Sequence, residues 1–364
     1  MLTTSYFCSQ IIAFDGFKGK IDHNYETLYI FFIDFVSQAI YYIHMESKKL
    51  QIIKLLDQQE LLKKDLDSLT YGSIEIREIK NGKYIYLHRR INGSIKSFYM
   101  GEYTTESYNL IVDKNNDAKI LKIKMRDIAK SLKSFNYVPK ELSDDVIEHL
   151  DKVKIDLTET IHKQAVSSRI PVTFSNIETI VEGEKISDVA LIDILKIFNL
   201  KKAWDFILNP YVLSCKTDYD LLITINELIS QNICFNAGYL RSVTSSISKT
   251  NWRPVLPVKT IVKNNLNFIL ENDVDIIDKA IDSLLYISKN KLFPDNNQLT
   301  AELYANHILL SNGIGILSIS EDRIQHYNTL LLKYFDTNNS LLIKEFLTKE
   351  CIAKNDYNIF DFGK

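Results

Sequence analysis

Two Asn-Gly pairs, Asn81-Gly82 and Asn92-Gly93, constrain the fold of this chain more than any other local feature. Asn-Gly favours the positive φ angles of a two-residue hairpin turn, so each pair predicts a reversal between antiparallel strands. The stretch between the two pairs alternates, with Tyr84, Tyr86 and His88 on one parity. The segment that ends at Gly101 is therefore expected to form a three-stranded meander.

Helical patterns flank this meander on both sides. Residues 46–69 carry leucine and isoleucine at helical spacing with charged residues between them, and residues 104–133 return to the same pattern. The sequence thus predicts a helix–β-meander–helix module over 46–138. Basic and aromatic residues of the meander are candidates for nucleic-acid contacts; they are Arg77, Lys83, Tyr84, Tyr86, His88, Arg89, Arg90 and Lys96. Because acidic residues are interspersed among them, the expected interpretation is that these side chains lie on solvated strand faces.

Composition excludes several classes of protein. The chain has 44 Lys and Arg against 46 Asp and Glu, and this net charge of -2 does not favour a dedicated nucleic-acid binder. Its four cysteines are scattered, which predicts neither a zinc site nor a disulfide framework and fits a cytoplasmic protein. Only 11 Gly and 6 Pro in 364 residues favour a mainly helical fold with short loops.

The N-terminal extension, residues 1–45, differs in composition from the rest of the chain. Residues 28–43 are strongly apolar and aromatic but short for a bilayer span, and they include Asp34. Three interpretations stay open: a buried or partner-packed helix, a membrane association, or a natural start at Met45. Apart from this segment, no membrane partner is expected.

A second domain is expected over 139–355. Pro139 and the acidic run 141–145 begin a new helix with favourable N-terminal charges. Apolar helical segments follow near 146–166, 186–208, 217–234, 257–271 and 275–289. Trp204 lies inside one of these patterns and is expected in the core, and His307 is expected to be packed or to cap a helix.

Residues 291–303, KLFPDNNQLTAEL, form a polar loop that runs directly into an apolar helix. Backbone N–H groups at a helix N-terminus can bind an anion. The loop resembles the signature loop of the Fic (Fido) family, H-P-F-x-D-G-N-G-R-x-x-R, because Phe293, Asp295 and Asn297 fall on matching positions.

Three further stretches resemble Fic proteins in the same order. Residues 234–241 are similar to a helix end with an A-G-x-x-R turn, residues 246–257 to the flap, and residues 306–327 to the post-motif helices. The resemblance covers about 160–350. It implies a Fic-like helical domain with a β-hairpin flap, and the preceding module is similar to one found in some bacterial Fic proteins. The flap residues that would contact an extended target peptide are Ile247, Ser248, Lys249, Thr250, Asn251 and Trp252.

The resemblance also implies roles for the loop residues. The family's catalytic histidine, which takes the proton from a target hydroxyl, corresponds to Lys291, and lysine is a poor base unless its pKa falls far below 10.4. The family's arginines correspond to Leu299 and Glu302. Asp295 matches a possible Mg²⁺ ligand, and the nucleotide-binding positions correspond to Asp295, Asn296, Asn297 and Gln298.

The family's inhibitory motif, S-x-x-x-E-G, corresponds to Ser167 through Val172, with Pro171 in place of the glutamate. Loss of this glutamate together with the loop arginine favours a non-catalytic protein that binds a protein or peptide partner through the flap and cleft, with a homodimer as a further possibility. The alternative is an atypical nucleotidyltransferase that moves AMP from ATP, with Mg²⁺, to a protein Ser, Thr or Tyr hydroxyl.

Overall fold

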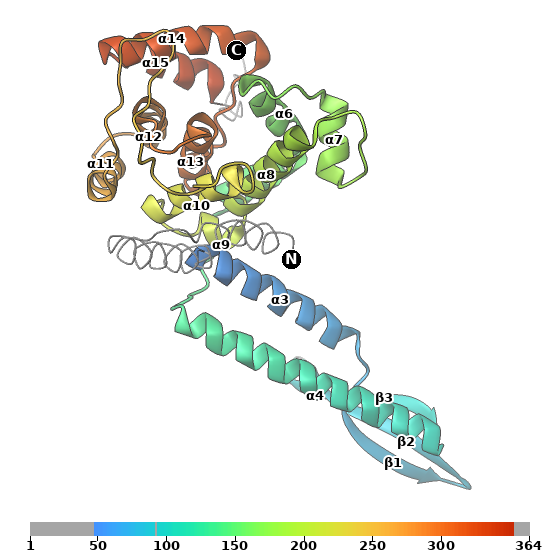
Figure 1. Cartoon of the computed structure of the whole chain (residues 1–364). Helices are drawn as coiled ribbons and strands as arrows, with labels where there is room; N and C mark the ends of the chain where they lie inside the picture. The colour runs from blue at the N-terminus through green and yellow to red at the C-terminus, as the bar shows by residue number, and fades with distance from the viewer. Residues whose placement is uncertain (1–46, 92, 353–364) are drawn as a thin grey trace, which may run out of the picture. The chain divides into compact units, whose positions relative to one another are not determined.

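The computed structural model describes residues 47–91 and 93–352. The chain divides into two compact units, residues 1–48 and 49–364. The described part of the second unit is mainly helical with one three-stranded sheet (Figure 1), which confirms the predicted fold class in these respects. The apolar segment 28–43 and the possible start at Met45 lie outside the described residues. Within the described residues, no helix combines the length and apolarity needed to cross a bilayer.

The elements follow the predicted order, but the segment predicted over 146–166 is two helices, and α7, α9 and α15 were not predicted. They are α3 (Lys48–Ser68), β1 (Ser73–Ile79), β2 (Gly82–Ile91), β3 (Ser94–Glu102), α4 (Thr105–Ser134), α5 (Asp144–Ile155), α6 (Leu157–Ser167), α7 (Phe174–Glu182), α8 (Leu191–Ile207), α9 (Pro210–Leu213), α10 (Tyr219–Ser230), α11 (Lys259–Glu271), α12 (Ile276–Asn290), α13 (Asn297–Ser311), the 3-10 helix η2 (Glu321–Arg323), α14 (Ile324–Thr337), α15 (Leu341–Phe346) and the π-helix η3 (Leu347–Cys351).

The sheet is an antiparallel meander in the order β1-β2-β3. Its first turn lies one residue earlier than Asn81-Gly82, since Ile79 pairs with Gly82 and the two loop residues are Lys80 and Asn81. This register pairs Ile85 with Ile76 and Leu87 with Ile74, whereas a turn at Asn81-Gly82 would place Glu78 opposite Ile85. Apolar pairing across the two strands therefore favours the observed turn over the local Asn-Gly preference.

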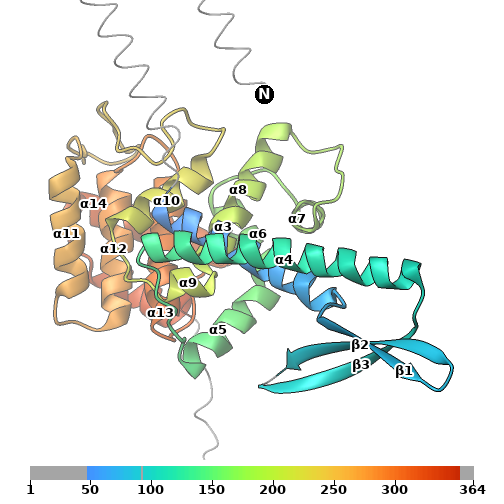
Figure 2. The same cartoon turned by 90° about the horizontal axis from the view of Figure 1, so that it is seen from below.

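Helix α4 packs along one face of the sheet (Figures 1 and 2). Ile111 of α4 forms a small core with Ile85 and Leu87. Asn115 of α4 also accepts a hydrogen bond from the Gly72 amide at 2.9 Å and donates to the Gly72 carbonyl at 3.1 Å. A Cβ at Gly72 would lie 2.6 Å from the His88 carbonyl oxygen, so this close approach requires glycine.

The helical domain is built around α13, which is buried along nearly its whole length, from Leu299 to Leu310. A helix that is buried on all sides is typical of a domain centre. α12 packs beside it in an antiparallel hairpin, and α10, α8 and α5 also contact it. Trp204 of α8 is fully buried, which confirms its predicted core position.

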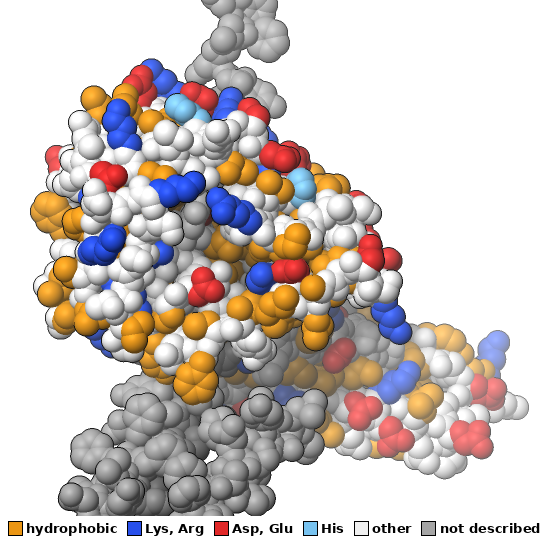
Figure 3. Space-filling model, turned by 45° about the horizontal axis from the view of Figure 1, so that its top comes forward, with side chains coloured by type: hydrophobic (Ala, Val, Ile, Leu, Met, Phe, Trp, Pro, Cys, Tyr) orange, Lys and Arg blue, Asp and Glu red, His pale blue; other side chains and the backbone are white. Residues whose placement is uncertain are grey.

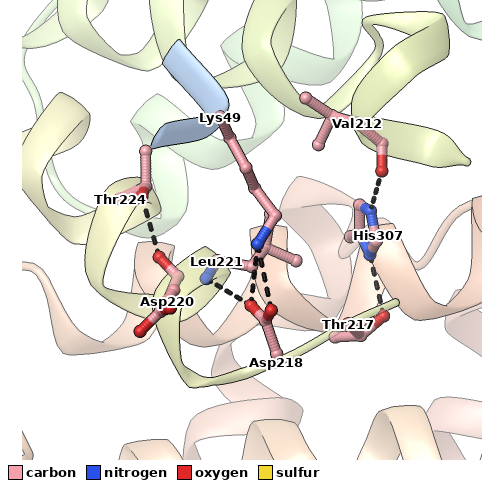
Figure 4. A network of polar contacts seen from close by, with 8 residues as sticks. All are labelled: Lys49, Val212, Thr217, Asp218, Asp220, Leu221, Thr224 and His307. Atoms are coloured by element: carbon pink, nitrogen blue, oxygen red, sulfur yellow. Dashed lines mark hydrogen bonds and ion pairs between the residues drawn. The ribbon is translucent and has the colours of Figure 1, made fainter. Parts of the chain in front are cut away.

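Helix α3 is tied to the helical domain by an ion pair next to a buried histidine (Figure 4). Lys49 Nζ lies 3.0 Å from Asp218 Oδ1, and the same carboxylate caps α10 through the Leu221 amide. His307 Nε2–H donates to the Val212 carbonyl, and its Nδ1 accepts from the Thr217 hydroxyl. Burial lowers the pKa of His307 to about 4, so the ring is neutral and packed, as expected.

The expected β-hairpin over 246–257 is absent: residues 231–258 contain neither helix nor strand in the described structure. Several backbone N–H and carbonyl groups of this segment are not available for pairing between two strands. Pro254 and Pro257 have no N–H to donate to a strand partner, Lys249 has a positive φ of 65°, and the carbonyls of Pro254 and Val255 accept from the Arg241 guanidinium.

Candidate functional site

The loop between α12 and α13 is a tight turn with two left-handed residues. Lys291 ends α12 with φ 42°, and Asn296 precedes α13 with φ 57°. Asn297 spans the loop, since its side chain accepts from the Phe293 amide and donates to the Phe293 carbonyl, each at 2.8 Å. Asparagine tolerates positive φ better than most residues, and Asn296 therefore turns the chain where the resemblance implies glycine.

Asn226 of α10 holds this loop through side-chain hydrogen bonds. Its side-chain amide is buried and donates to the Asp295 carbonyl at 3.2 Å and to the Thr300 hydroxyl at 3.0 Å, and its oxygen accepts from the Gly238 amide. The Asn296 side chain in turn donates to the Ser230 hydroxyl. These hydrogen bonds connect the start of α13 to α10 and to the turn at Gly238.

Arg241 joins the loop to the flap segment, residues 246–257. The side chain is 3 % exposed, and its guanidinium donates only to backbone carbonyls. Its Nε–H donates to Lys291 O at 2.6 Å, and its terminal nitrogens donate to the carbonyls of Val243, Asn290, Pro254 and Val255. Burial lowers the pKa of Arg241, which nevertheless stays far above neutral pH.

Two of the predicted target-binding residues face the protein's own core. Ile247 is buried in the main hydrophobic cluster. Trp252 is half-buried, its indole N–H donates to Lys289 O at 3.0 Å, and its ring faces the Lys289 ammonium at 4.5 Å. The Asn251 amide donates to Asp336 Oδ1, and the Thr250 hydroxyl accepts from the Trp252 amide. Ser248 and Lys249 remain exposed between these anchors.

Two of the predicted site residues, Lys291 at the end of α12 and Leu299 in the first turn of α13, make contacts within the protein. Lys291 Nζ donates to the Ser246 carbonyl at 3.1 Å. Leu299 is buried at 5 % exposure, in contact with the main core. In this fold Lys291 therefore contacts the flap segment, and Leu299 packs in the core.

Glu302, at the second arginine position, is a buried acid in a polar network. Its carboxyl accepts from Gln298 at 3.3 Å and from Gln164 of α6 at 3.2 Å. The Gln164 side-chain carbonyl accepts from the Trp204 indole at 2.7 Å. Burial raises the pKa of Glu302 to about 7. Helix α6, which contains the predicted inhibitory motif, thus contacts the second arginine position through the hydrogen bond from the Gln164 side-chain amide to the Glu302 carboxyl.

The predicted inhibitory-motif residues lie at the end of α6. Ser167 is the last helical residue, and its hydroxyl donates to Gln164 O. Pro171 is exposed and lies beyond the helix, after Arg169, whose φ is 57°. Sequence reasoning did not identify Gln164, although a glutamine three residues before Ser167 on an otherwise apolar helix face is a signal for a buried polar partner.

A cavity of about 520 Å³ opens between the end of α6, the flap segment and α14. This volume is in the range of small-ligand pockets. Figure 3 shows basic, acidic and apolar side chains interspersed over one face of the molecule. Of the predicted site residues, the cavity brings together Ser167 and Lys249, and the 291–298 loop does not line it; the lining residues are Val166, Ser167, Arg169, Lys249, Glu321, Ile324, Gln325, Asn328, Thr329 and Leu332.

The residues of the loop do not fit a nucleoside triphosphate with Mg²⁺. Lys291 is the one cation of the 291–298 loop, and its ammonium is engaged by Ser246. Asp295 is exposed, and its Oδ1 accepts from the Asn296 amide. Across the described residues, no three His, Cys, Asp or Glu side chains converge as metal ligands.

Comparison with protein families gives one match, over residues 52–108, to a domain of unknown function, DUF6788. This stretch runs from α3 through the meander into α4. No curated protein matches the sequence.

Among solved structures, the chain is similar to Fic-1 (residues 134–508) from C. elegans, with 14% identity, a TM-score of 0.48, and coverage of 67% of this chain and 81% of that chain. It is also similar to a Fic family protein from Desulfovibrio desulfuricans G20, with 12% identity, a TM-score of 0.41, and coverage of 55% and 70%. A Fic domain containing signaling protein from Bacteroides thetaiotaomicron VPI-5482 has 15% identity, a TM-score of 0.42, and coverage of 53% and 75%.

Proposed function

We propose that residues 139–355 form a degenerate Fic-type domain that transfers no nucleotide and binds a protein partner through the flap segment and the adjoining cavity. The observation that carries this proposal is the Glu302 network. A carboxyl group, buried and bonded to Gln164 and Gln298, stands where the resemblance implies a phosphate-binding arginine. An acid at that position repels phosphate when it is ionised, and it offers no bidentate donor.

The other loop contacts support the same proposal. A general base must be free to approach the target hydroxyl, whereas Lys291 donates to Ser246. The Gln298 side-chain amide points to Glu302 within the protein. The internal contacts of these two residues make the loop a structural connection between α12 and α13.

The proposed partner surface consists of Ser248, Lys249 and the cavity. The flap segment is fixed on both sides of the exposed pair, by Ile247 in the core and by the Trp252 indole bond. A fixed segment with a short exposed centre loses little conformational entropy on binding. Lys249 and Arg169 give the cavity lining two positive charges against the one negative charge of Glu321, and Ile324 and Leu332 give it apolar surface.

The proposal is tested by affinity capture with the full chain and by incubation with tagged ATP. We expect one protein to be captured by the wild type and by Lys185→Glu, a matched control at an exposed lysine between α7 and α8, and to be lost with Lys249→Glu. No protein in the mixture should acquire the nucleotide tag.

Tag transfer that disappears with Asp295→Ala would instead support the alternative, an atypical nucleotidyltransferase. Capture that is equal for Lys249→Glu and Lys185→Glu would show that the partner binds elsewhere. The two readouts are independent, so the partner surface and the absence of transfer are judged separately.

A further inference from the structure

The near-neutral charge of the whole chain conceals a strong asymmetry. Residues 48–134, which contain α3, the sheet and α4, carry 18 Lys and Arg against 11 Asp and Glu, a net charge of +7. The whole chain has a net charge of -2, so all other residues together carry -9. Such an asymmetry favours an anionic partner for the basic part.

The sheet face opposite α4 carries a cluster of three tyrosines. Tyr86 pairs with Tyr99 across β2 and β3, so both side chains lie on the same face, and Tyr84 shares that face because it is two residues from Tyr86. The Tyr99 ring centroid lies 5.4 Å from that of Tyr86 and 6.1 Å from that of Tyr84. Tyr99 is 59% exposed. We name these three residues the tyrosine face.

Cationic groups border the tyrosine face. The Arg77 guanidinium lies 4.5 Å from the Tyr86 ring centroid. Two acids share this face. Glu75 accepts from Arg77 at 2.8 Å and from His88 at 2.6 Å, and these hydrogen bonds lower its pKa to about 2. Glu102 is exposed and pairs with Tyr84 at the edge of the face. Arg90 is exposed, and its place in β2 puts it on the same face as His88 and Tyr86.

We propose that the tyrosine face binds single-stranded nucleic acid, with bases stacked on the tyrosine rings and the phosphates held by Arg77, Arg90 and the positive charge of the module. Tyr99 is exposed and Tyr84 and Tyr86 are half-buried. Accessible rings beside cations suit single strands, because every base has a face that can stack and every linkage has a negative charge. A second copy of the same module would bring +7 against +7, which disfavours self-association through this face. A duplex hides its base faces and cannot use the rings.

The test is fluorescence anisotropy of a labelled 20-nucleotide oligo(dT) with the full chain at low salt. We expect saturable binding that weakens as salt rises. The double variant Tyr86→Ala, Tyr99→Ala should weaken it by about tenfold or more, and Arg90→Glu should weaken it and reduce the salt dependence. Because phenylalanine can also stack, Tyr99→Phe should retain binding, whereas a purely structural role for the hydroxyl would not tolerate it.

The matched control is Phe235→Ala, an exposed aromatic residue outside the module, at 83% exposure, and it should leave binding unchanged. Circular dichroism confirms that the tyrosine variants remain folded. The proposal is overturned if oligo(dT) does not bind at low salt, if the tyrosine variants bind equally well, or if a duplex of the same length competes as strongly as the single strand.

Discussion

Replacing Arg241 with methionine is expected to lower the free energy of unfolding by about 3 kcal/mol or more. The methionine would fill much of the same volume but would leave five backbone carbonyls, those of Val243, Pro254, Val255, Asn290 and Lys291, without their donor. The bond to the Pro254 carbonyl is buried and the other four are partly buried. A buried carbonyl without a donor is among the costly changes in a protein interior. Arg241→Lys should recover little of this loss, because one ammonium cannot reproduce the planar set of donors.

Urea denaturation of the full chain measures this effect. Arg253→Met is the matched control, since Arg253 is exposed and donates to the neighbouring Thr250 and Trp252 carbonyls. This variant should lower the free energy of unfolding only slightly. A loss below about 1 kcal/mol for Arg241→Met would contradict the proposed role of Arg241 as the connection between loop and flap segment.

Glu302→Gln is expected to stabilise the protein at alkaline pH and to leave it almost unchanged at pH 4.5. The folded-state pKa of Glu302 is raised from 4.5 to about 7 by burial. Protonated Glu302 therefore stabilises the folded state fully below pH 4.5, and this stabilisation is lost as the pH rises through 7. Ionising this buried acid costs about 3 kcal/mol on that basis, which a neutral glutamine avoids.

The measurement is the difference in unfolding free energy between wild type and variant across pH 4.5 to 8. His307 has the opposite pH dependence: because its pKa is lowered to about 4, its contribution to stability is complete above pH 6.5 and is lost as the pH falls towards 4. This contribution is the same in wild type and variant, so it cancels in the difference. Glu182→Gln, at an exposed position, should show no such pH-dependent difference. A constant difference for Glu302→Gln would mean that the carboxyl is ionised throughout.

Local sequence patterns predicted the parts of this fold that depend on local chemistry. The meander, the flanking helices and the core position of Trp204 follow from alternation, helical spacing and apolar context, which act over a few residues. The turn before β2 was misplaced by one residue because the pairing of Ile85 with Ile76 and of Leu87 with Ile74 outweighs the local preference.

Long-range polar contacts could not be predicted from local patterns. Arg241 satisfies the carbonyls of Pro254 and Val255, and this replaces the cross-strand pairing that a hairpin would need. Gln164 and Glu302 are separated by 138 positions, and no local pattern pairs them. Among the candidate site residues, the sequence located the α13 start, whereas the inward orientation of Ile247 and Trp252 depends on the packed domain.

The central claim is that the 291–298 loop connects two helices and holds no nucleotide, and ATP binding tests it most directly. Isothermal titration calorimetry of the full chain with ATP and Mg²⁺ at pH 7.5 is predicted to show no saturable heat up to millimolar ATP, for wild type and for Asp295→Ala alike. Saturable binding in the micromolar range that Asp295→Ala abolishes would contradict the claim.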